Sequence, residues 1–227
     1  MNTLFVGQNL MHLDTLESTN TFLMDFSKEK TLPEGTLVWV DYQSKGRGQQ
    51  GQTWQTKAGQ NLTFSLLLRP QFLAAEKQFL LSMAVALGVY DLLKGYQLDA
   101  LVKWPNDIYT SKGKIAGILI ENAWEGQRWK HAVIGIGLNV FQTSGWEGAQ
   151  ASSLALEKEQ VPSVSSVLEK LCSCLEGRYL QLKSREKQIL EEYHQVLMGV
   201  DRPLKYEDAN GQFEALVRKC YPQVNWF

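Results

Sequence analysis

Apolar positions along the chain follow two periods, and each period predicts one kind of element. Where apolar residues alternate with polar ones, or cluster with β-branched and aromatic residues, we expect strands. Six such segments are Leu10–Leu16, Thr36–Tyr42, Leu62–Leu68, Leu101–Trp104, Ile115–Glu121 and Trp129–Val140. Where apolar residues recur every three to four positions, we expect helices. Three such segments are Asn20–Glu29, Phe72–Gly95 and Ser163–Met198, the last with a break near Ser184.

The order of these elements predicts an α+β fold. Turn-length connections link most of the predicted strands, which favours a mixed or antiparallel sheet covered by helices over repeated strand–helix–strand units. The length of 227 residues predicts a catalytic-sized domain, residues 1–199, and a small C-terminal β segment, residues 200–227. In that segment Pro203–Tyr206 and Phe213–Val217 flank an Asp208–Gly211 turn and predict a hairpin. An isolated hairpin is marginally stable in water, so we expect it to dock on the main domain or to belong to an incomplete module.

Composition and charge exclude several classes of protein. With 44% hydrophobic and 21% charged residues, the chain resembles a soluble globule and not a disordered or fibrous protein. A net charge of −1 and a pI near 6.3 argue against a nucleic-acid partner. The most apolar stretch, Phe72–Leu93, is interrupted by Glu76, Lys77 and Asp91, so we expect no membrane partner and a cytoplasmic protein. The three cysteines and three histidines lack the spacing of a zinc site.

The chain has one local charge asymmetry. Between Asp41 and Glu76 there is no acidic residue, although the whole chain is almost neutral, and the cations in this stretch are Lys45, Arg47, Lys57 and Arg69. Chance is one explanation, and a loop that binds an anion is the other. The centre of the stretch is Gly46-Arg-Gly48-Gln-Gln-Gly51, whose glycines let backbone amides approach a ligand. We therefore expect an anion site in this loop.

This hexapeptide matches the G-x-G-x-x-G pattern of dinucleotide-binding folds, but its context differs. Gln52–Gly59, which follows it, does not begin a helix, and Leu66–Gln71, about twenty residues on, has no carboxylate for a ribose. The chain also lacks the His-Arg-Asp and Asp-Phe-Gly partners of a kinase loop and has no G-x-x-x-x-G-K-[ST] sequence. The usual functions of the pattern are therefore excluded.

Two further segments carry candidate chemistry. In Lys103-Trp-Pro-Asn-Asp107 the proline and asparagine favour a strand end followed by a turn, so Lys103 lies beside a rigid corner. A surface hairpin with solvated lysines is the alternative. In Ile134-Gly-Ile-Gly-Leu-Asn139 the alternating glycines let another group approach the strand, and Asn139 offers an amide that can recognise a purine edge. Tight sheet packing is the alternative there.

Six motifs in their order along the chain resemble the biotin protein ligase family. They are Glu17-Ser-Thr-Asn20; Tyr42-Gln-Ser-Lys-Gly-Arg-Gly48 with Gly51 and Trp54; Asn61-Leu-Thr-Phe-Ser65; Lys103-Trp-Pro-Asn-Asp107; Lys114-Ile-Ala-Gly-Ile-Leu-Ile-Glu121; and Ile134-Gly-Ile-Gly-Leu-Asn139. The resemblance covers roughly residues 10–200. It implies a catalytic domain like that of the class II synthetases and biotin ligases, followed by a shortened SH3-like β segment.

The resemblance also implies a two-step activity. Biotin is activated with ATP, with Mg²⁺ on the phosphates, to give biotinyl-5′-AMP, and biotin is then transferred to a lysine of a biotin carboxyl carrier protein domain. In the first step two anions, the biotin carboxylate and the α-phosphate, must meet, so the protein must supply fixed positive charge. The chemistry needs no nucleophile from the enzyme.

Individual residues receive roles from the same resemblance. Lys103 and Arg47 are the expected catalytic cations, with Lys103 bridging the carboxylate and the phosphate. The expected biotin-binding residues are Ser18, Thr19, Asn20, Gln43, Gly46, Arg47, Gly48, Gln49, Trp54, Lys103 and Gly117. The expected nucleotide-binding residues are Arg47, Lys103, Lys114 and Asn139. Asp107 is a candidate ligand of Mg²⁺, with turn capping as its alternative role.

The chain departs from the family pattern in three places. Gln49, Gln50 and Gln52 stand where arginine-rich relatives carry arginines, which predicts a looser hold on the adenylate. No helix-turn-helix module precedes Leu10, so a repressor function is not expected. An SH3-like barrel needs about 40 residues, more than follow residue 199. Within the family pattern, the loop Gln43–Lys57 is expected to be mobile when empty and ordered over the adenylate.

Two other functions and one assembly remain open from the sequence. A lipoate or octanoyl transferase would share the fold, but it is not expected to carry both the glycine-rich loop and Lys103–Asp107. A non-catalytic biotin-binding regulator would need none of Arg47, Lys103 and Asn139. A homodimer would form if a partner strand completed an exposed edge near Trp129–Val140.

Overall fold

A computed structural model describes residues 1–146, 148, 150–200, 203–208, 211–217 and 220. The central sheet has seven strands: β1 (Leu10–Leu16), β2 (Leu37–Gln43), β3 (Asn61–Leu68), β4 (Leu101–Lys103), β5 (Asp107–Thr110), β6 (Gly113–Glu125) and β7 (Arg128–Asn139). The helices are α1 (Thr19–Glu29), α2 (Phe79–Gly95), α3 (Leu154–Glu157), α4 (Val164–Ser184) and α5 (Glu186–Gln195). A second sheet pairs β8 (Leu204–Asp208) with β9 (Gly211–Ala215).

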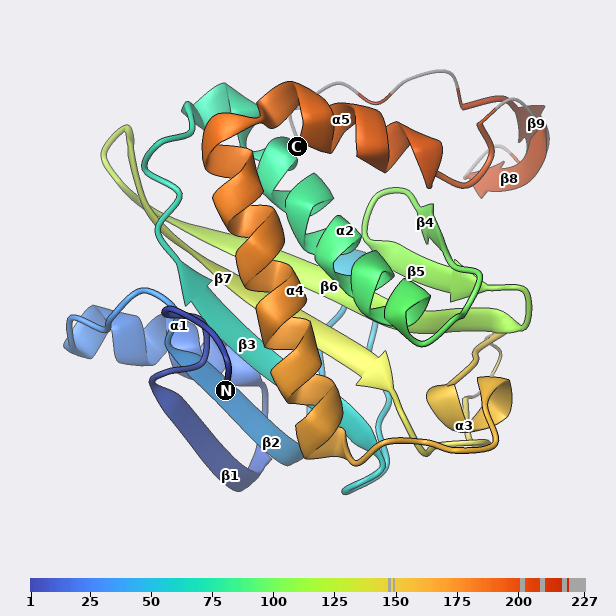
Figure 1. The fold of residues 1–227 in the computed structure, drawn as a ribbon, viewed down its shortest axis with the longest axis horizontal. Helices are drawn as coiled ribbons and strands as arrows, with labels where there is room; N and C mark the ends of the chain where they lie inside the picture. Colours follow the sequence, from blue (N-terminus) through green and yellow to red (C-terminus); the bar gives the residue numbers. More distant parts are fainter. Residues whose placement is uncertain (147, 149, 201–202, 209–210, 218–219, 221–227) are drawn as a thin grey trace.

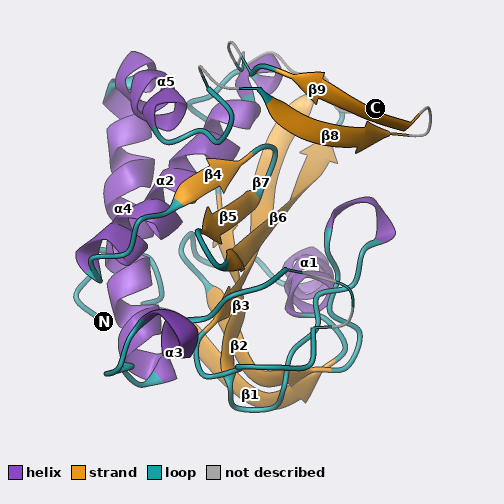
Figure 2. Ribbon diagram, turned by 90° about the vertical axis from the view of Figure 1, so that its right-hand side faces the viewer, coloured by secondary structure: helices purple, strands orange, loops and turns teal. Residues whose placement is uncertain are grey.

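Helices cover both faces of the central sheet. Helices α2, α4 and α5 lie on one face (Figure 1), and α1 lies on the other, as Figure 2 shows with the sheet nearly edge-on. The strand order is β1-β2-β3-β7-β6-β5-β4. Strands β1 and β2 are parallel and every other neighbouring pair is antiparallel. The predicted α+β fold with a mixed, helix-covered sheet is confirmed.

The structure differs from the sequence prediction in the start of one helix and in one additional strand, and it contains the predicted helix break. The helix expected from Phe72 begins only at Phe79, because the chain first turns at Pro70, whose oxygen accepts from Leu73 N at 3.0 Å. The expected break near Ser184 is present between α4 and α5. Strand β5 was not predicted, because it is a four-residue strand that begins directly after a tight turn.

Side-chain alternation along the central strands separates two cores. On β3 and β7, Phe64, Leu66, Ile134 and Ile136 belong to the large core that also contains the buried faces of α2 and α4. The intervening residues point to α1, where a smaller core forms around Leu23. Farther along the same strands, the α1-facing positions are glycines and short polar residues, and the cavity described below lies there.

Helix α2 carries the most apolar stretch of the chain. Among the described residues, Ala75–Gly95 is the one helical stretch that is long and apolar enough to cross a membrane by length and composition alone. In the structure 67% of its apolar window is buried inside the protein. Its apolar residues thus supply the large core.

The segment predicted to be an exposed sheet edge, near Trp129–Val140, lies inside the sheet. Strand β7 lies between β3 and β6, and both neighbours pair with it along its length. The prediction of an exposed edge near Trp129–Val140 is therefore wrong. The edge strands are β1 and β4, and Val102 of β4 bonds on its outer side to Val196 and Met198, at 2.8 Å each.

The C-terminal hairpin exists, and residues that follow β9 contact the preceding part of the chain. Val217 N donates to Gly199 O at 3.2 Å, and Cys220 N donates to His194 Nε2 of α5 at 2.9 Å. These contacts agree with the expected docking, while the division at residues 199 and 200 stays a prediction. Part of the predicted turn, residues 209–210, and residues 221–227 lie outside the described residues.

A buried histidine behind α1 predicts an acid-sensitive fold. His131 is 3% exposed, and its Nε2 lies 3.0 Å from Ser27 Oγ. Burial, with smaller contributions from Arg69 and Lys130, lowers the pKa of His131 to about 4. Between about pH 4 and 6.5 the unfolded chain therefore binds a proton that the folded chain does not, so stability falls as pH falls through this window.

We expect His131→Gln to remove this dependence. Relative to the variant, the wild type should lose up to about 3 kcal/mol of unfolding free energy on acidification from pH 6.5 to 4. Urea unfolding of both proteins across this range measures the difference, and parallel curves would contradict the assignment.

Candidate active site

A row of paired residues forms the floor of a cavity on the α1 face of the sheet. Thr63 pairs with Gly137, Gly137 with Gly117, Gly117 with Asp107, and Asp107 with Lys103, across strands β3, β7, β6, β5 and β4. Directly paired residues share a face of the sheet. Because two glycines occupy the middle of the row, the surface is hollow there, and a cavity of about 240 Å³ lies above it. We call it the main cavity.

The indole of Trp54 lies against both glycines. A Cβ atom at Gly137 would lie 2.1 Å from Trp54 Cε2, and one at Gly117 would lie 3.0 Å from Trp54 Cζ3. Neither position accepts a side chain unless the indole moves. The group that approaches the strand at Gly117 is therefore Trp54, which the sequence analysis had named only among the expected biotin-binding residues.

Short polar side chains gather at one end of the main cavity. Ser18 caps helix α1, which begins at Thr19. Gln43 Oε1 accepts from Thr19 N at 2.7 Å and from Thr19 Oγ1 at 2.9 Å, and Ser65 Oγ lies 2.7 Å from the same hydroxyl. Ser65 Oγ also lies 2.5 Å from Asn20 Oδ1. This network fixes each side chain, and among the described residues no acceptor contacts the Nε2 group of Gln43, so it can donate to a ligand.

Lys114 lies at the opposite end of the main cavity. Its Nζ is 2.7 Å from Asp107 Oδ1 and 5.5 Å from the centre of the Trp54 ring. The lysine backbone is fixed as well, because Lys114 N donates to Gln150 O at 3.0 Å and Lys114 O accepts from Ser152 N at 2.8 Å. The lysine is thus held from both its backbone and its charged end.

A second recess, of about 560 Å³, adjoins the main cavity, and both Lys114 and Trp54 line the two spaces. Asn139 lies in this Asn139 recess and is 2% exposed. Its Nδ2 donates to Ser152 O at 2.9 Å, whereas its Oδ1 is buried without a donor among the described residues. An unpaired buried acceptor is costly, so this oxygen marks a position for a donor on a ligand.

The cations of the acid-free stretch do not form one anion site. Lys45, Lys57 and Arg69 are absent from the residues that line the main cavity. Arg47 lines it, but its Nη2 lies 2.6 Å from Glu121 Oε2, so its charge is paired. Among the described residues, Arg47 is thus the one cation of this stretch that lines the main cavity, and the anion site expected in the loop stays a prediction.

The loop glycines likewise serve the loop's own backbone. Gly48 N donates to Gln52 O at 2.6 Å, so this amide is not free for a ligand. A Cβ atom at Gly46 would lie 2.4 Å from Trp54 O, and Trp54 N donates to Gly46 O at 3.0 Å. Glycine is needed at residue 46 because two segments of the loop approach each other there.

A profile of the biotin/lipoate A/B protein ligase family matches residues 13–139, more than half of the chain and nearly all of the sheet that carries the cavity. The chain belongs to this family. The bifunctional ligase/repressor BirA of Bacillus subtilis is 31% identical over 224 residues, which cover 94% of this chain and 67% of that protein. The biotin–[acetyl-CoA-carboxylase] ligase of Mycobacterium tuberculosis is 28% identical over 199 residues, covering 86% and 73%.

A solved structure of a family member has the same fold. The biotin protein ligase from Aquifex aeolicus, in complex with biotin and ATP, superposes with a TM-score of 0.79 at 25% identity, covering 95% of this chain and 89% of that one.

Most of the predicted site residues of this ligase-family chain meet at the main cavity. Those that line it are Ser18, Thr19, Asn20, Gln43, Arg47, Gly48, Gln49, Trp54, Asp107, Lys114 and Gly117. Asn139 lines the adjoining recess, and Gly46 lies behind Trp54. The structure therefore brings together a site that the chain carries in five separate segments.

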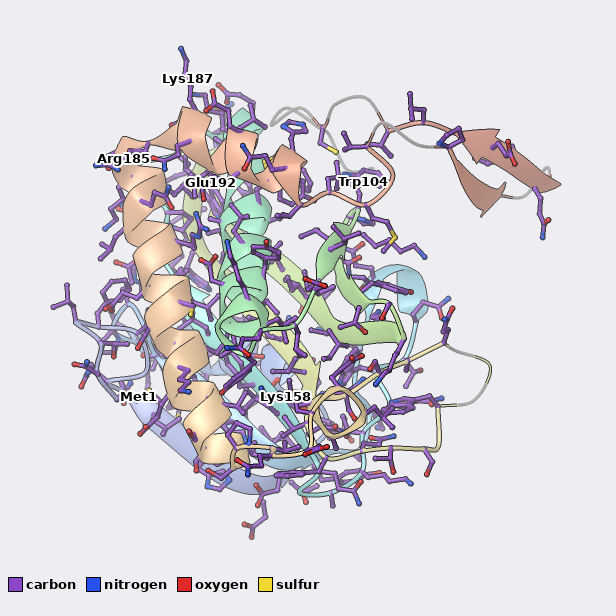
Figure 3. All side chains as sticks on the ribbon, turned by 45° about the vertical axis from the view of Figure 1, so that its right-hand side comes forward. Met1, Trp104, Lys158, Arg185, Lys187 and Glu192 are labelled. Atoms are coloured by element: carbon purple, nitrogen blue, oxygen red, sulfur yellow. The ribbon has the colours of Figure 1, made fainter. Side chains whose placement is uncertain are left out.

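Lys103 lies at the end of the floor row, where it pairs with Asp107, and its expected catalytic role stays a prediction. It is exposed, it does not line either space, and its Nζ lies 5.0 Å from the centre of the Tyr109 ring. The reason is its position at the end of the floor row: two strands, β5 and β6, separate it from Gly137. Figure 3 shows the neighbouring Trp104 at the outer end of the β4–β5 hairpin. The lysine at the centre of the site is Lys114.

Two contributions to the site were missed from the sequence. Ser65 holds Thr19 and Asn20, and Gly135 leaves space for Asn20, because a Cβ there would lie 2.4 Å from Asn20 Oδ1. The signal was the period of two: Ser65 and Gly135 are paired residues on the face of the sheet that carries the glycine floor.

Proposed function

We propose that the protein is an ATP-dependent biotin protein ligase, which forms biotinyl-5′-AMP and transfers biotin to a lysine of a biotin carboxyl carrier protein domain. The observation that carries this proposal is the position of Lys114 where two spaces meet. One space ends in a network of short polar side chains, and the other contains the unpaired oxygen of Asn139. A single ammonium group can thus contact a carboxylate in the first space and a phosphate in the second.

Each part of the substrate pair fits one of these features. The main cavity suits biotin, with its ureido ring at Ser18, Thr19 and Gln43 and its carboxylate toward Lys114. The Asn139 recess suits adenosine, whose exocyclic amine supplies the donor that Asn139 Oδ1 lacks. Trp54 forms the apolar wall between the two ligands.

In the first step the protein must orient biotin and ATP and supply positive charge between them. An oxygen of the biotin carboxylate attacks the α-phosphorus, a P–O bond forms, and the bond to pyrophosphate breaks. Lys114 reduces the repulsion between the two anions and stabilises the charge on the equatorial oxygens, which is worth most in a site that excludes water.

The residues present fit a Mg²⁺ ion. Asp107 is the one acidic side chain among the described residues that line either space. Mg²⁺ is commonly held by one or two carboxylates together with substrate phosphates. Asp107 would hold such an ion, which would neutralise charge on the phosphates, and the same carboxylate lies 2.7 Å from the Lys114 ammonium. Asp107 is the first residue of strand β5, directly after the turn, so a turn-capping role stays its alternative.

In the second step the neutral amine of the carrier lysine attacks the acyl carbon. A C–N bond forms, the C–O bond to AMP breaks, and the amine loses its proton. Carrier recognition, a cytoplasmic location and a possible homodimer belong to this proposal as expectations.

The experiment that tests the function offers the purified protein a choice of substrates. With Mg²⁺-ATP and an apo carrier domain, biotin should appear on the carrier lysine, and lipoate or octanoate should not. Labelling of a lipoyl domain by lipoate or octanoate would favour the transferase alternative. Binding of biotin without pyrophosphate release would favour the non-catalytic regulator.

The glutamine-containing loop gives a prediction about retention of the intermediate. Gln49 lines the main cavity and carries no charge. We expect Gln49→Arg to slow release of biotinyl-AMP by roughly tenfold, the effect of one charge-assisted hydrogen bond to a phosphate. Release is measured by trapping free adenylate after a single turnover, and an unchanged release rate would contradict the prediction.

A further inference from the structure

Glu121 is a carboxylate of β6 that the mechanism does not use. One of its oxygens, Oε2, accepts from Arg47 Nη2 at 2.6 Å and from Asn20 Nδ2 at 2.9 Å. Arg47 belongs to the loop over the main cavity, and Asn20 belongs to the first turn of α1. One oxygen atom therefore joins the loop to the helix that begins with the ureido-binding residues.

The position of Glu121 along β6 separates it from the chemistry. The Lys114 side chain folds back over Gly117, since a Cβ there would lie 3.4 Å from Lys114 Nζ. Glu121 lies four residues farther along the strand, or about 13 Å away. A group at that distance from the reacting atoms affects the reaction by holding other residues in place.

The side chain of Asn20 is itself fixed, so it holds Glu121 in a defined position. Asn20 is 3% exposed, its Oδ1 lies 2.5 Å from Ser65 Oγ, and Gly135 provides the space for it. The asparagine is thus fixed in the sheet, and through Glu121 it offers a fixed acceptor to Arg47. Arg47 and Glu121 also both line an outer recess of about 590 Å³, and Arg47 lines the main cavity as well, so the pair lies where the two spaces adjoin.

We propose that Glu121 is a positioning residue that holds the Arg47 loop closed over bound biotin, and that the Arg47–Glu121 pair limits the rate at which biotin leaves. This inference rests on the proposed function, because it assigns biotin to the main cavity. It also changes the role of Arg47 from a catalytic cation to the loop side of a closing contact.

The experiment is a double-substitution cycle on biotin dissociation. Glu121→Gln removes the charge but keeps an oxygen that accepts from Asn20, and Arg47→Gln removes the other partner. Each substitution, and the two together, should raise the biotin dissociation rate by the same factor, roughly tenfold. For Glu121→Gln, whose side chain does not line the main cavity, the rate of adenylate formation at saturating biotin and ATP should change less than twofold, while the KM for biotin rises. In the wild type, added salt should accelerate biotin release, because the pair is partly exposed, with 46% of the Arg47 and 32% of the Glu121 side chain accessible.

A matched control lies at the base of the same loop. Lys45 Nζ is 2.7 Å from Glu17 Oε1, but both side chains are about 70% exposed, and neither lines the main cavity. Glu17→Gln should leave biotin release unchanged. Additive effects of the two test substitutions, or a fall in the rate at saturation with KM unchanged, would overturn the proposal. If the wild-type protein binds no biotin at all, the proposed function itself fails, which is a distinguishable result.

Discussion

Replacing Lys114 with alanine is expected to lower the rate of biotinyl-AMP formation by about 100- to 1000-fold. This is the usual cost of removing a fixed group that stabilises transition-state charge. Biotin affinity should fall far less, because the polar end of the main cavity, around Gln43 and Thr19, is untouched. Pyrophosphate release and direct biotin binding, measured on the same preparation, separate the two effects.

Lys103→Ala is the matched control for this prediction. Both lysines lie on strands of the central sheet, Lys103 on β4 and Lys114 on β6, but Lys103 is exposed and lines neither space. Its substitution should reduce the adenylation rate by less than about tenfold. If Lys103→Ala proved the more damaging of the two, the assignment of the central cation to Lys114 would be wrong.

A single added methyl group at Gly137 is expected to lower the affinity for biotin strongly. The new Cβ would lie 2.1 Å from Trp54 Cε2, so Gly137→Ala must displace the indole from the cavity floor. Overpacking of this kind costs about 1–3 kcal/mol. If the indole must return for biotin to bind, biotin affinity falls roughly 5- to 150-fold. Isothermal titration with biotin measures the loss.

Gly177→Ala is the control for this substitution. Gly177 lies in α4, and apart from its neighbours and the backbone of its own helix no heavy atom lies within 4 Å of its added Cβ, so the change should leave affinity unaltered and stabilise the helix slightly. The thermal unfolding midpoint of Gly137→Ala distinguishes a displaced indole from a disrupted sheet. Unchanged biotin affinity in a folded Gly137→Ala protein would show that Trp54 is not fixed by the glycine floor.

The fold could be predicted from the sequence because its periodic signals are strong. The alternation in Leu62–Leu68 and the long apolar repeat of α4 each correspond to one element of the structure. Strand β5 was not predicted, because a strand of four residues has too few alternating positions to be recognised. The order of the strands in the sheet was not predicted either. Strand β7 is central because β3 pairs with it across more than sixty residues of chain, and no local sequence pattern contains that information.

The sequence predicted which residues form the candidate site better than it predicted how those residues are arranged. Motifs identified Gln43, Trp54 and Asn139, but charge alone could not tell which of several lysines faces the cavity. Lys103 and Lys114 differ only in where the sheet register places them, with Lys103 at the end of the floor row and Lys114 folded over Gly117. In the same way, the excess of cations around Arg47 concealed its distant partner Glu121.

The most direct test of the central claim is a single-turnover assay for biotinyl-AMP, made without any carrier protein. Purified protein, biotin and Mg²⁺-ATP should yield one equivalent of enzyme-bound biotinyl-AMP and one of pyrophosphate, both detected by mass spectrometry and both strongly reduced in Lys114→Ala. Formation of the adenylate at the wild-type rate in Lys114→Ala, or no biotinyl-AMP from the wild type, would contradict the account.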